Sequence, residues 1–462
     1  MNDLSETLKS IVGDGHWATD AARLEPHVTE WRGVHRGRAR MLLMPDSADQ
    51  VAAIVRACAA ARVAIVPQGG NTGTCAGAIP DDSGEQVIVN LRRMNRIRSV
   101  DADDFSLVAE AGCVLADLQR AAAEAGRLLP LSHGGEGSSQ IGGNLSTNAG
   151  GINVLRYGTA RSLVLGVEAV LADGTIWDGI RTLRKDTAGY DLKQLFIGSE
   201  GTLGVITAVA LKLFPLPGEM STALVALRQA ADAVRLLGRC RELLGDRIQA
   251  FELISARAFD YVVRHLPGAR LPFDTPHPWY VLTDVASGGD ADTLQSALND
   301  AADMIDDAVV AKNISEAESL WRMRHAIPES EKREGPGAKH DISVPVGRIN
   351  AFLDAADSAL RKRYPLLEPV IFGHVGDGNL HYNVMLPAEP GDDAQEQLKH
   401  EVSTLVYDVV TRFGGSISAE HGIGLAKKAF LARYRGDVEL GLMRTLKNAL
   451  DPLGILNPGK VI

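Results

Sequence analysis

The sequence is poor in cysteine and contains no long apolar run. Its four cysteines are widely spaced and form no C-x-x-C pair, which argues against a disulfide framework, an iron–sulfur cluster and a zinc ribbon. A reducing compartment, the cytoplasm, is therefore expected. No stretch approaches the about 20 apolar residues of a membrane span, so none is expected. Asp3, Glu6 and Asp14 interrupt the first residues, which do not have the pattern of a signal peptide.

Positive charge is also scarce. The chain has 48 Lys and Arg against 58 Asp and Glu, which gives a net charge of -10 at pH 7. Nucleic-acid binding is not expected, because it depends on a basic surface that neutralises phosphates. An anionic substrate would need local basic residues. At about 100–200 residues per domain, the length predicts about three domains.

Two tracts, Val63–Pro80 and Gly137–Leu155, contain no charged residue at all and are filled with Gly, Asn, Ser, Thr and Gln. Such chain offers many backbone N–H groups and tolerates positive φ, as a cradle around a large polar ligand requires. Two glycine-rich turns are the simpler alternative. A third glycine-rich segment, Gly198–Gly204, favours the cradle. The segment Pro67–Thr74 of the first tract follows a predicted strand but matches neither a Walker A nor a G-x-G-x-x-G motif, so a Rossmann site is not expected.

Apolar periodicity predicts an α+β fold without internal repeats. A capping box at Ser47 and Gln50 predicts a helix that precedes the first tract. From about Ser221, the alternation of strands and helices predicts a domain of ferredoxin-like type. We expect strands at 63–66, 87–90, 107–109, 164–171, 223–227, 248–253, 279–284, 342–345, 370–373 and 381–385, and helices at 115–125, 230–244, 292–305, 316–332, 394–413 and 438–450.

Two histidines, His374 and His381, flank a glycine-rich turn, and Glu420-His421 lies in a second glycine-rich segment. Two imidazoles and one carboxylate suit a divalent transition metal such as zinc or manganese and leave positions open for a substrate. A pair of hydrogen-bonded structural histidines is the alternative.

Taken together, these motifs show a resemblance to a known family. The segments 67–74, 142–151, 198–204, 374–381, 418–424 and 457–460 occur in the order seen in flavin-dependent 2-hydroxy-acid dehydrogenases of the vanillyl-alcohol-oxidase type, which the chain resembles from about Trp31 to Ile462. The resemblance implies an FAD-binding domain of the p-cresol methylhydroxylase (PCMH) type at 1–216, a ferredoxin-like α+β cap domain for the substrate at 217–392, and a helical segment at 393–462 that packs on both.

The same resemblance implies roles for individual residues. FAD is expected to be held without a covalent bond, since no histidine lies between Pro67 and Pro80, although Cys75 keeps this point testable. The metal ligands would be His374, His381 and Glu420, with zinc favoured over manganese. The expected FAD-binding residues are Pro67, Gly69, Gly70, Asn71, Thr72, Gly73, Thr74, Gly142, Gly143, Asn144, Ser146, Thr147, Asn148, Gly150, Gly151, Gly201, Thr202, Gly204, Val205, Ile206 and Asn457.

Within the family, the chain most resembles the enzymes that oxidise D-2-hydroxyglutarate, with those that oxidise D-lactate as the alternative. The resemblance implies that Arg324, Lys339 and Asn383 bind the substrate, and two cations suit the two carboxylates of hydroxyglutarate. Pro328 departs from the pattern, because the hydroxyglutarate enzymes carry a hydroxyl side chain there. This departure leaves room for another D-2-hydroxy acid.

We expect His421 to bind the substrate and to act as the general base, taking the proton of a metal-bound hydroxyl while hydride leaves for flavin N5. The electrons would pass to an acceptor such as electron-transfer flavoprotein or a quinone, and family members are often homodimers. Two alternatives remain: a metal-dependent hydrolase, which leaves the uncharged tracts unexplained, and a non-catalytic flavin-binding subunit.

Overall fold

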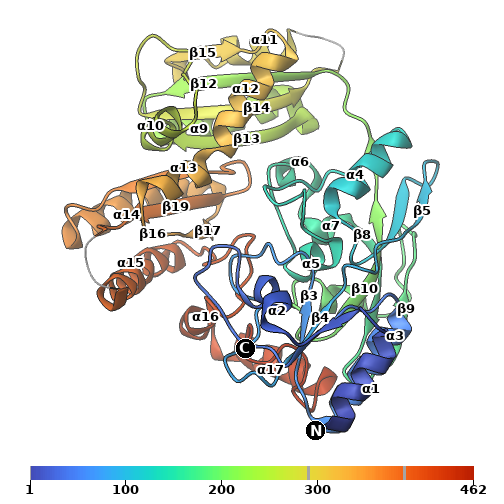
Figure 1. Ribbon diagram of the computed structural model, residues 1–462. Coiled ribbons are helices and arrows are strands. Elements are labelled where there is room, and N and C mark those ends of the chain that lie inside the picture. The colour runs from blue at the N-terminus through green and yellow to red at the C-terminus, as the bar shows by residue number, and fades with distance from the viewer. Residues whose placement is uncertain (1, 289–291, 389–391) are drawn as a thin grey trace. The chain divides into compact units, whose positions relative to one another are not determined.

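The computed structural model describes residues 2–288, 292–388 and 392–462. The contacts within the chain group it into two compact units (Figure 1). Unit 1 comprises the chain up to Gly150 together with Gly158–Leu216 and Glu420–Ile462, and unit 2 comprises Gly151–Tyr157 and Pro217–Ala419. The division of the sequence at residues 216 and 392 stays a prediction.

Unit 1 contains two main sheets. The first has the order β1-β2-β4-β3, and the second, which is antiparallel, has the order β5-β6-β10-β8-β9. A two-stranded pair joins β7 and β11. The strands are β1 Trp17–Ala18, β2 Met41–Leu43, β3 Ile65–Gln68, β4 Val87–Asn90, β5 Ile97–Asp101, β6 Ser106–Glu110, β7 Arg127–Leu128, β8 Val164–Val170, β9 Ile176–Gly179, β10 Val205–Lys212 and β11 Phe214–Pro215.

The helices of unit 1 include the one that the capping box predicts. In α3, the Ser47 hydroxyl accepts the N–H of Gln50, and the Gln50 side chain accepts the N–H of Asp46, one residue before the expected partner. The helix then delivers the chain to β3. The helices are α1 Asn2–Val12, α2 Ala21–Val28, α3 Ala48–Ala61, α4 Leu115–Glu124, α5 Ile141–Ser146, α7 Ala160–Leu163, α8 Lys193–Phe196, α16 Lys428–Tyr434 and α17 Asp437–Leu450.

Strand β3 lies in the parallel part of the first sheet, because β2 and β3 both pair with β4 in parallel register. The first uncharged tract therefore leaves the carboxyl end of a parallel strand. On the other side of β3, the N–H of Ile65 donates to Ile455 and the N–H of Asn457 donates to Ile65, both at 2.7 Å. Asn457 is thus attached to the strand that carries the glycine-rich loop.

Unit 2 is built on one large antiparallel sheet of order β15-β12-β14-β13-β18-β19-β16, with β17 also paired to β19 (Figure 1). The first four strands follow the chain as β12-α9-β13-α10-β14-α11-β15, which is the ferredoxin-like order that the sequence predicts with one additional helix, α10, between β13 and β14. The strands are β12 Met220–Leu227, β13 Ile248–Ser255, β14 Trp279–Ala286, β15 Asp307–Val310, β16 Gly337–Ala338, β17 Asp341–Ser343, β18 Pro369–Gly373 and β19 Asn379–Met385.

The helices of unit 2 are α6 Val154–Tyr157, α9 Ala230–Leu244, α10 Ala256–His265, α11 Thr293–Asp300, α12 Ile314–His325, α13 Ile327–Glu334, α14 Ile349–Arg363 and α15 Asp392–Arg412. Short 3-10 turns cover Gly245–Arg247, Ala302–Met304 and Val346–Arg348. One core cluster packs Phe259, Tyr280 and Phe372 with Met323 and Ile327. It joins the sheet to α10, α12 and α13.

The expected single helix over 316–332 is wrong, because the structure has two helices there, with Ala326 between α12 and α13. Pro328 is the cause. It has no N–H to donate to the Arg324 carbonyl one turn earlier, and its ring would collide with that carbonyl. Proline is tolerated in the first turn of a helix, so α13 begins there instead. The break ends α12 just after Arg324.

None of the helices in the described ranges combines the length and apolar character that crossing a membrane would require.

Candidate active site

The uncharged tracts of unit 1 meet at a point where only glycine fits. A Cβ atom on Gly70 would lie 2.1 Å from the carbonyl oxygen of Ser138. The loop that follows β3 therefore packs its backbone against the beginning of the second tract. Two segments that are about 70 residues apart in sequence form one surface of backbone groups, as the composition of the two tracts predicts.

Left-handed backbone is concentrated in these segments. Among the non-glycine residues with positive φ are Asn71 at 55°, Ala76 at 56°, Asn148 at 53°, Glu200 at 52° and Asn457 at 45°. All five belong to the first or second tract, the 198–204 segment or the terminal motif. Such conformations cost free energy and persist where the surrounding structure requires them, which is typical of ligand-binding loops.

The predicted FAD-binding residues lie in unit 1 with one exception. Gly151 falls in the short segment that groups with unit 2. Fewer polar groups of the second tract are available to a ligand than its composition suggests, because residues 141–146 form helix α5. There the hydroxyls of Ser146 and Thr147 donate to the carbonyl of Gly142 and that of Gly143, at 2.7 and 3.3 Å. Val205 and Ile206 begin β10, directly after the turn that holds Gly201, Thr202 and Gly204.

The side chain of Asn457 is held in one orientation and keeps a buried acceptor oxygen, as a residue that binds a polar ligand would. Its Nδ2 donates to the carbonyls of Gly77 and Glu200, both at 2.8 Å, so the side chain is held in place. Within the described residues, its buried Oδ1 and the Oε1 of Gln140 accept no hydrogen bond. Since buried polar atoms are usually paired, these acceptors, together with the close-packed glycine loops, fit a large polar cofactor.

Glu200 holds the loop 420–424, which carries the predicted base His421, within unit 1. It is buried, and its two carboxylate oxygens accept the N–H groups of Ile423 at 2.7 Å and Gly424 at 2.8 Å. Burial raises the pKa of Glu200, while these two donors oppose the rise. Cys75 holds the same loop, because its carbonyl accepts the N–H of Leu425 at 2.9 Å. Glu200 lies in the glycine-rich segment 198–204, but nothing in the sequence pattern indicates this role.

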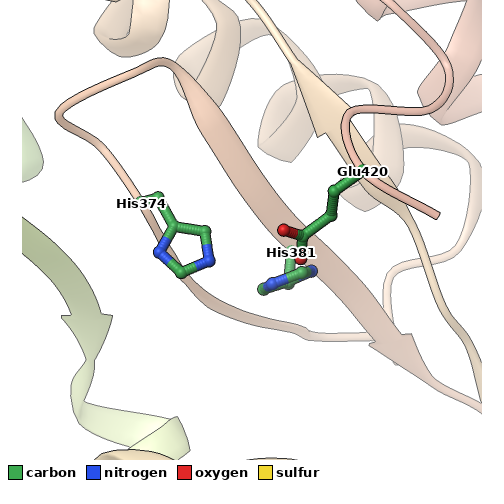
Figure 2. A group of neighbouring side chains, drawn as sticks. All are labelled: His374, His381 and Glu420. Atoms are coloured by element: carbon green, nitrogen blue, oxygen red, sulfur yellow. The ribbon is translucent and has the colours of Figure 1, made fainter. Parts of the chain in front are cut away.

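The predicted metal ligands come together. His374 follows β18, His381 lies in β19, and one ligand atom from each, together with one from Glu420, all lie within 4.8 Å of one another. Figure 2 shows the Glu420 carboxylate turned toward the His381 ring, with His374 beside them. Glu420 directly follows Ala419, the last residue of unit 2, whose N–H donates to Asp341 at 3.2 Å.

A second group of possible ligands shares Glu420 and adds Asp341 and His421. The His421 Nε2 lies 3.7 Å from a Glu420 oxygen, and the His421 side chain is partly exposed. Asp341 is buried and accepts the amide of Asn379 at 2.9 Å. The predicted base therefore lies beside the predicted ligands, as the adjacent positions in the sequence require.

Arg324 and His374 share a carboxylate that the sequence analysis did not identify. Glu252, on β13, accepts from Arg324 Nε at 2.8 Å, and its other oxygen lies 2.5 Å from His374 Nδ1. Burial by itself would raise the pKa of Glu252, but His374 and Arg324 lower it to about 2. The carboxylate is therefore ionised.

Lys339 and Asn383 share a second buried carboxylate, Glu331 on α13. Lys339 Nζ lies 2.5 Å from Glu331 Oε2, and Asn383 Nδ2 donates to both Glu331 oxygens at 2.9 and 3.0 Å. The Asn383 Oδ1 accepts the N–H of His340 at 3.0 Å. Both cations that the resemblance assigns to substrate are thus already paired with buried glutamates.

The sequence contained a signal for only one of these glutamates. Glu252 interrupts the apolar run of β13, and a charged residue in a buried strand requires a partner. Glu331 lies in the polar segment Ile327–Glu334, where acidic and basic residues alternate and none stands out. Its burial follows from the packing of α13, which the sequence pattern does not reveal.

Comparisons with known proteins identify the class. Residues 39–179 match the family described as FAD binding domain, and residues 216–461 match the family described as FAD linked oxidases, C-terminal domain. The chain is similar over its whole length to the solved structure of p-cresol methylhydroxylase with substrate bound, with a TM-score of 0.80, 18% identity and coverage of 100% of this chain and 96% of that one. This likeness confirms the PCMH-type fold.

The chain therefore belongs to the FAD-linked oxidases and is an FAD-dependent dehydrogenase, so the hydrolase alternative is wrong. It is 40% identical to D-2-hydroxyglutarate dehydrogenase, mitochondrial, of Bos taurus over 97% of this chain and 81% of that protein. It is 38% identical to the Arabidopsis thaliana protein of the same name, over 98% and 80%. It is 34% identical to a putative D-lactate dehydrogenase, C713.03, mitochondrial, of Schizosaccharomyces pombe, over 99% and 89%.

Proposed function

We propose that this protein oxidises a D-2-hydroxy acid to the corresponding 2-oxo acid, with D-2-hydroxyglutarate as the first substrate to test. The observation that carries the proposal is the convergence of His374, His381 and Glu420 beside His421, in a chain that also has the glycine-rich FAD segments. Names of relatives support the same substrate class, since they include D-2-hydroxyglutarate dehydrogenase and D-lactate dehydrogenase.

The donor set fits a divalent metal, with zinc favoured over manganese. Two imidazoles and one carboxylate are the protein ligands typical of a catalytic zinc site that keeps a position open for substrate. When bound there, zinc would supply Lewis-acid chemistry that lowers the pKa of a coordinated hydroxyl, as it lowers that of water to about 7, and bound FAD would supply the hydride acceptor.

The side chains of this protein then position the substrate and move its proton. His421 accepts the proton of the 2-hydroxyl group, which is the task of a general base. The Arg324 guanidinium receives a carboxylate of the substrate through its planar donors, and its existing bonds to Glu252 hold it in orientation. Asn383 is the third residue that we assign to the substrate, and its side chain is held by Glu331 and by the N–H of His340.

The second substrate carboxylate distinguishes the two leading candidates. D-2-hydroxyglutarate has one and D-lactate does not, and Lys339 is the cation we assign to it. Pro328 provides no hydroxyl donor in this region, and Glu331 already pairs with Lys339. These two features favour testing D-lactate and longer apolar D-2-hydroxy acids beside D-2-hydroxyglutarate. The electrons pass to a mobile acceptor such as electron-transfer flavoprotein or a quinone.

The decisive experiment is anaerobic reduction of the bound flavin by a panel of D- and L-2-hydroxy acids. We expect bleaching of the visible flavin absorption by D-2-hydroxyglutarate, much slower bleaching by the L-form, and loss of bleaching after treatment with a chelator. Restored bleaching on addition of Zn²⁺ would identify the metal. A flavin that no D-2-hydroxy acid reduces, with or without added metal, would refute the proposal and favour the non-catalytic subunit.

A further inference from the structure

Glu252 stands next to His374 because of the register of the sheet in unit 2. Strands β13 and β18 are antiparallel, with Leu253 opposite Gly373 and Ile254 opposite Phe372. Continuing this register by one residue pair places Glu252 opposite His374, the first residue after β18. The Glu252 side chain is completely buried. A carboxylate is thus placed beside one of the proposed metal ligands by the backbone of the sheet.

The contact between them selects one form of the imidazole. Glu252 Oε1 lies 2.5 Å from His374 Nδ1. Arg324 donates to the other oxygen of the same carboxylate at 2.8 Å, so Glu252 is an acceptor on that side, and we take His374 Nδ1 as the donor in this contact. In a neutral imidazole that is protonated on Nδ1, Nε2 carries the lone pair that a metal ion binds. Histidine ligands commonly donate their second N–H to a carboxylate, which fixes the tautomer and the ring orientation.

Arg324 holds the other carboxylate oxygen. Its Nε and Nη2 lie 2.8 and 2.7 Å from Glu252 Oε2, and its guanidinium lies over the Phe372 ring at 4.9 Å from the centroid. Arg324 itself is buried. The carboxylate is therefore fixed from both sides, and its orientation toward His374 does not depend on solvent.

We propose that Glu252 is a positioning residue that sets the tautomer and orientation of His374 for metal binding and links the metal site to the substrate cation Arg324 in one network. This inference rests on the metal site of the proposed function and extends it. Glu252 contacts neither substrate nor flavin in this scheme. It acts through His374 on the metal and through Arg324 on the carboxylate of the substrate.

Glu331 offers a matched control. Glu252 and Glu331 both have side chains that are 1% exposed, and each pairs with one of the two proposed substrate cations. Only Glu252 has a described contact with a proposed metal ligand. Glu252→Gln and Glu331→Gln therefore make the same chemical change at two equally buried glutamates, and the two positions differ in their relation to His374.

The test measures Zn²⁺ affinity of the FAD-loaded protein after removal of metal, by competition with a chromophoric chelator. We expect Glu252→Gln to weaken zinc binding about 10- to 100-fold, the usual effect of removing such a partner, and Glu331→Gln to change it less than about twofold. Flavin absorption and thermal unfolding, measured on each variant, show whether it is folded. Glu252→Gln with wild-type zinc affinity would overturn the inference.

A second variant covers the case in which Glu252→Gln does not fold. Glu252→Asp keeps the negative charge that Arg324 needs but withdraws the carboxylate by one methylene from His374. We expect at least about threefold weaker zinc binding, a smaller loss than removal of the partner causes, and an unchanged affinity would also refute the inference. Failure of the wild-type protein to bind Zn²⁺ is a different result, because it would remove the metal from the proposed function itself.

Discussion

The cradle of unit 1 and the charged network of unit 2 recognise their ligands in different ways. The cradle uses backbone groups from uncharged loops, and Gly70 and Asn71 hold its shape locally. The network uses ionised side chains: Glu252 holds Arg324, 72 positions away in sequence, and Glu331 holds Lys339, 8 positions away, together with Asn383, 52 positions away. A site made of backbone is therefore visible in local composition, whereas a site made of charges depends on pairing across the fold.

The largest expected effect separates catalysis from cofactor binding. His421→Ala should lower kcat for D-2-hydroxyglutarate by about 10²- to 10⁴-fold, because it removes the general base. The flavin content should stay at the wild-type level, since the FAD segments are untouched. Steady-state rates and the ratio of flavin to protein absorption measure the two effects. A variant that keeps most of its activity would show that another group takes the proton.

A smaller loss is expected at Glu200, a residue of the glycine-rich segment 198–204 that accepts hydrogen bonds from the loop carrying His421. Glu200→Ala removes the acceptor for the N–H groups of Ile423 and Gly424, and an unpaired buried donor costs about 1–3 kcal/mol. The loop that carries His421 should then move, lowering kcat by about tenfold or more.

Glu200→Gln, which keeps one acceptor oxygen, is the control and should fall between the wild type and the alanine variant in both kcat and thermal stability. Equal activity of all three proteins would mean that the loop is held by Cys75 and its other contacts alone.

Charge balance around the substrate gives a third prediction. Glu331→Gln leaves Lys339 without its ion-pair partner, so a second substrate carboxylate should be attracted more strongly. We expect KM for D-2-hydroxyglutarate to fall about three- to tenfold, that is, by at most about 1.4 kcal/mol. KM for D-lactate, which has no second carboxylate, is the internal control. Equal changes for both substrates would show that Lys339 does not contact that carboxylate.

The smallest expected effect is the alkylation of three buried cysteines, Cys58 and Cys113 in unit 1 and Cys240 in unit 2. Burial raises the pKa of Cys58 to about 12 and that of Cys113 and of Cys240 to about 11. Because the thiolate is the reactive form and these pKa values lie above pH 8, alkylation should be negligible there in the native protein and should increase as the pH rises toward 11. Mass spectrometry after iodoacetamide treatment measures it, and denatured protein is the control. Rapid labelling at pH 8 would contradict the burial.

Much of the fold was predictable because its elements follow simple periodic patterns. Helix α9 has the predicted bounds of 230–244, and the strands β12, β13 and β14 lie where the sequence predicts them, although α10, between β13 and β14, was not predicted. The helix break at Pro328 was readable in principle, since proline cannot continue a helix. The residues of the predicted metal group were named from their chemistry, and the fold brings them together.

By itself, the sequence determined where backbone could be exposed to a ligand and which side chains could bind a metal, because these depend on residue type and local spacing. Only the tertiary structure decided which charges meet. The register of β13 against β18 placed Glu252 beside His374, and the packing of α13 placed Glu331 beside Lys339 and Asn383. The energy of a charge depends on its neighbours in space, and neighbours 72 or 122 positions away in sequence, as Arg324 and His374 are from Glu252, are chosen by the fold.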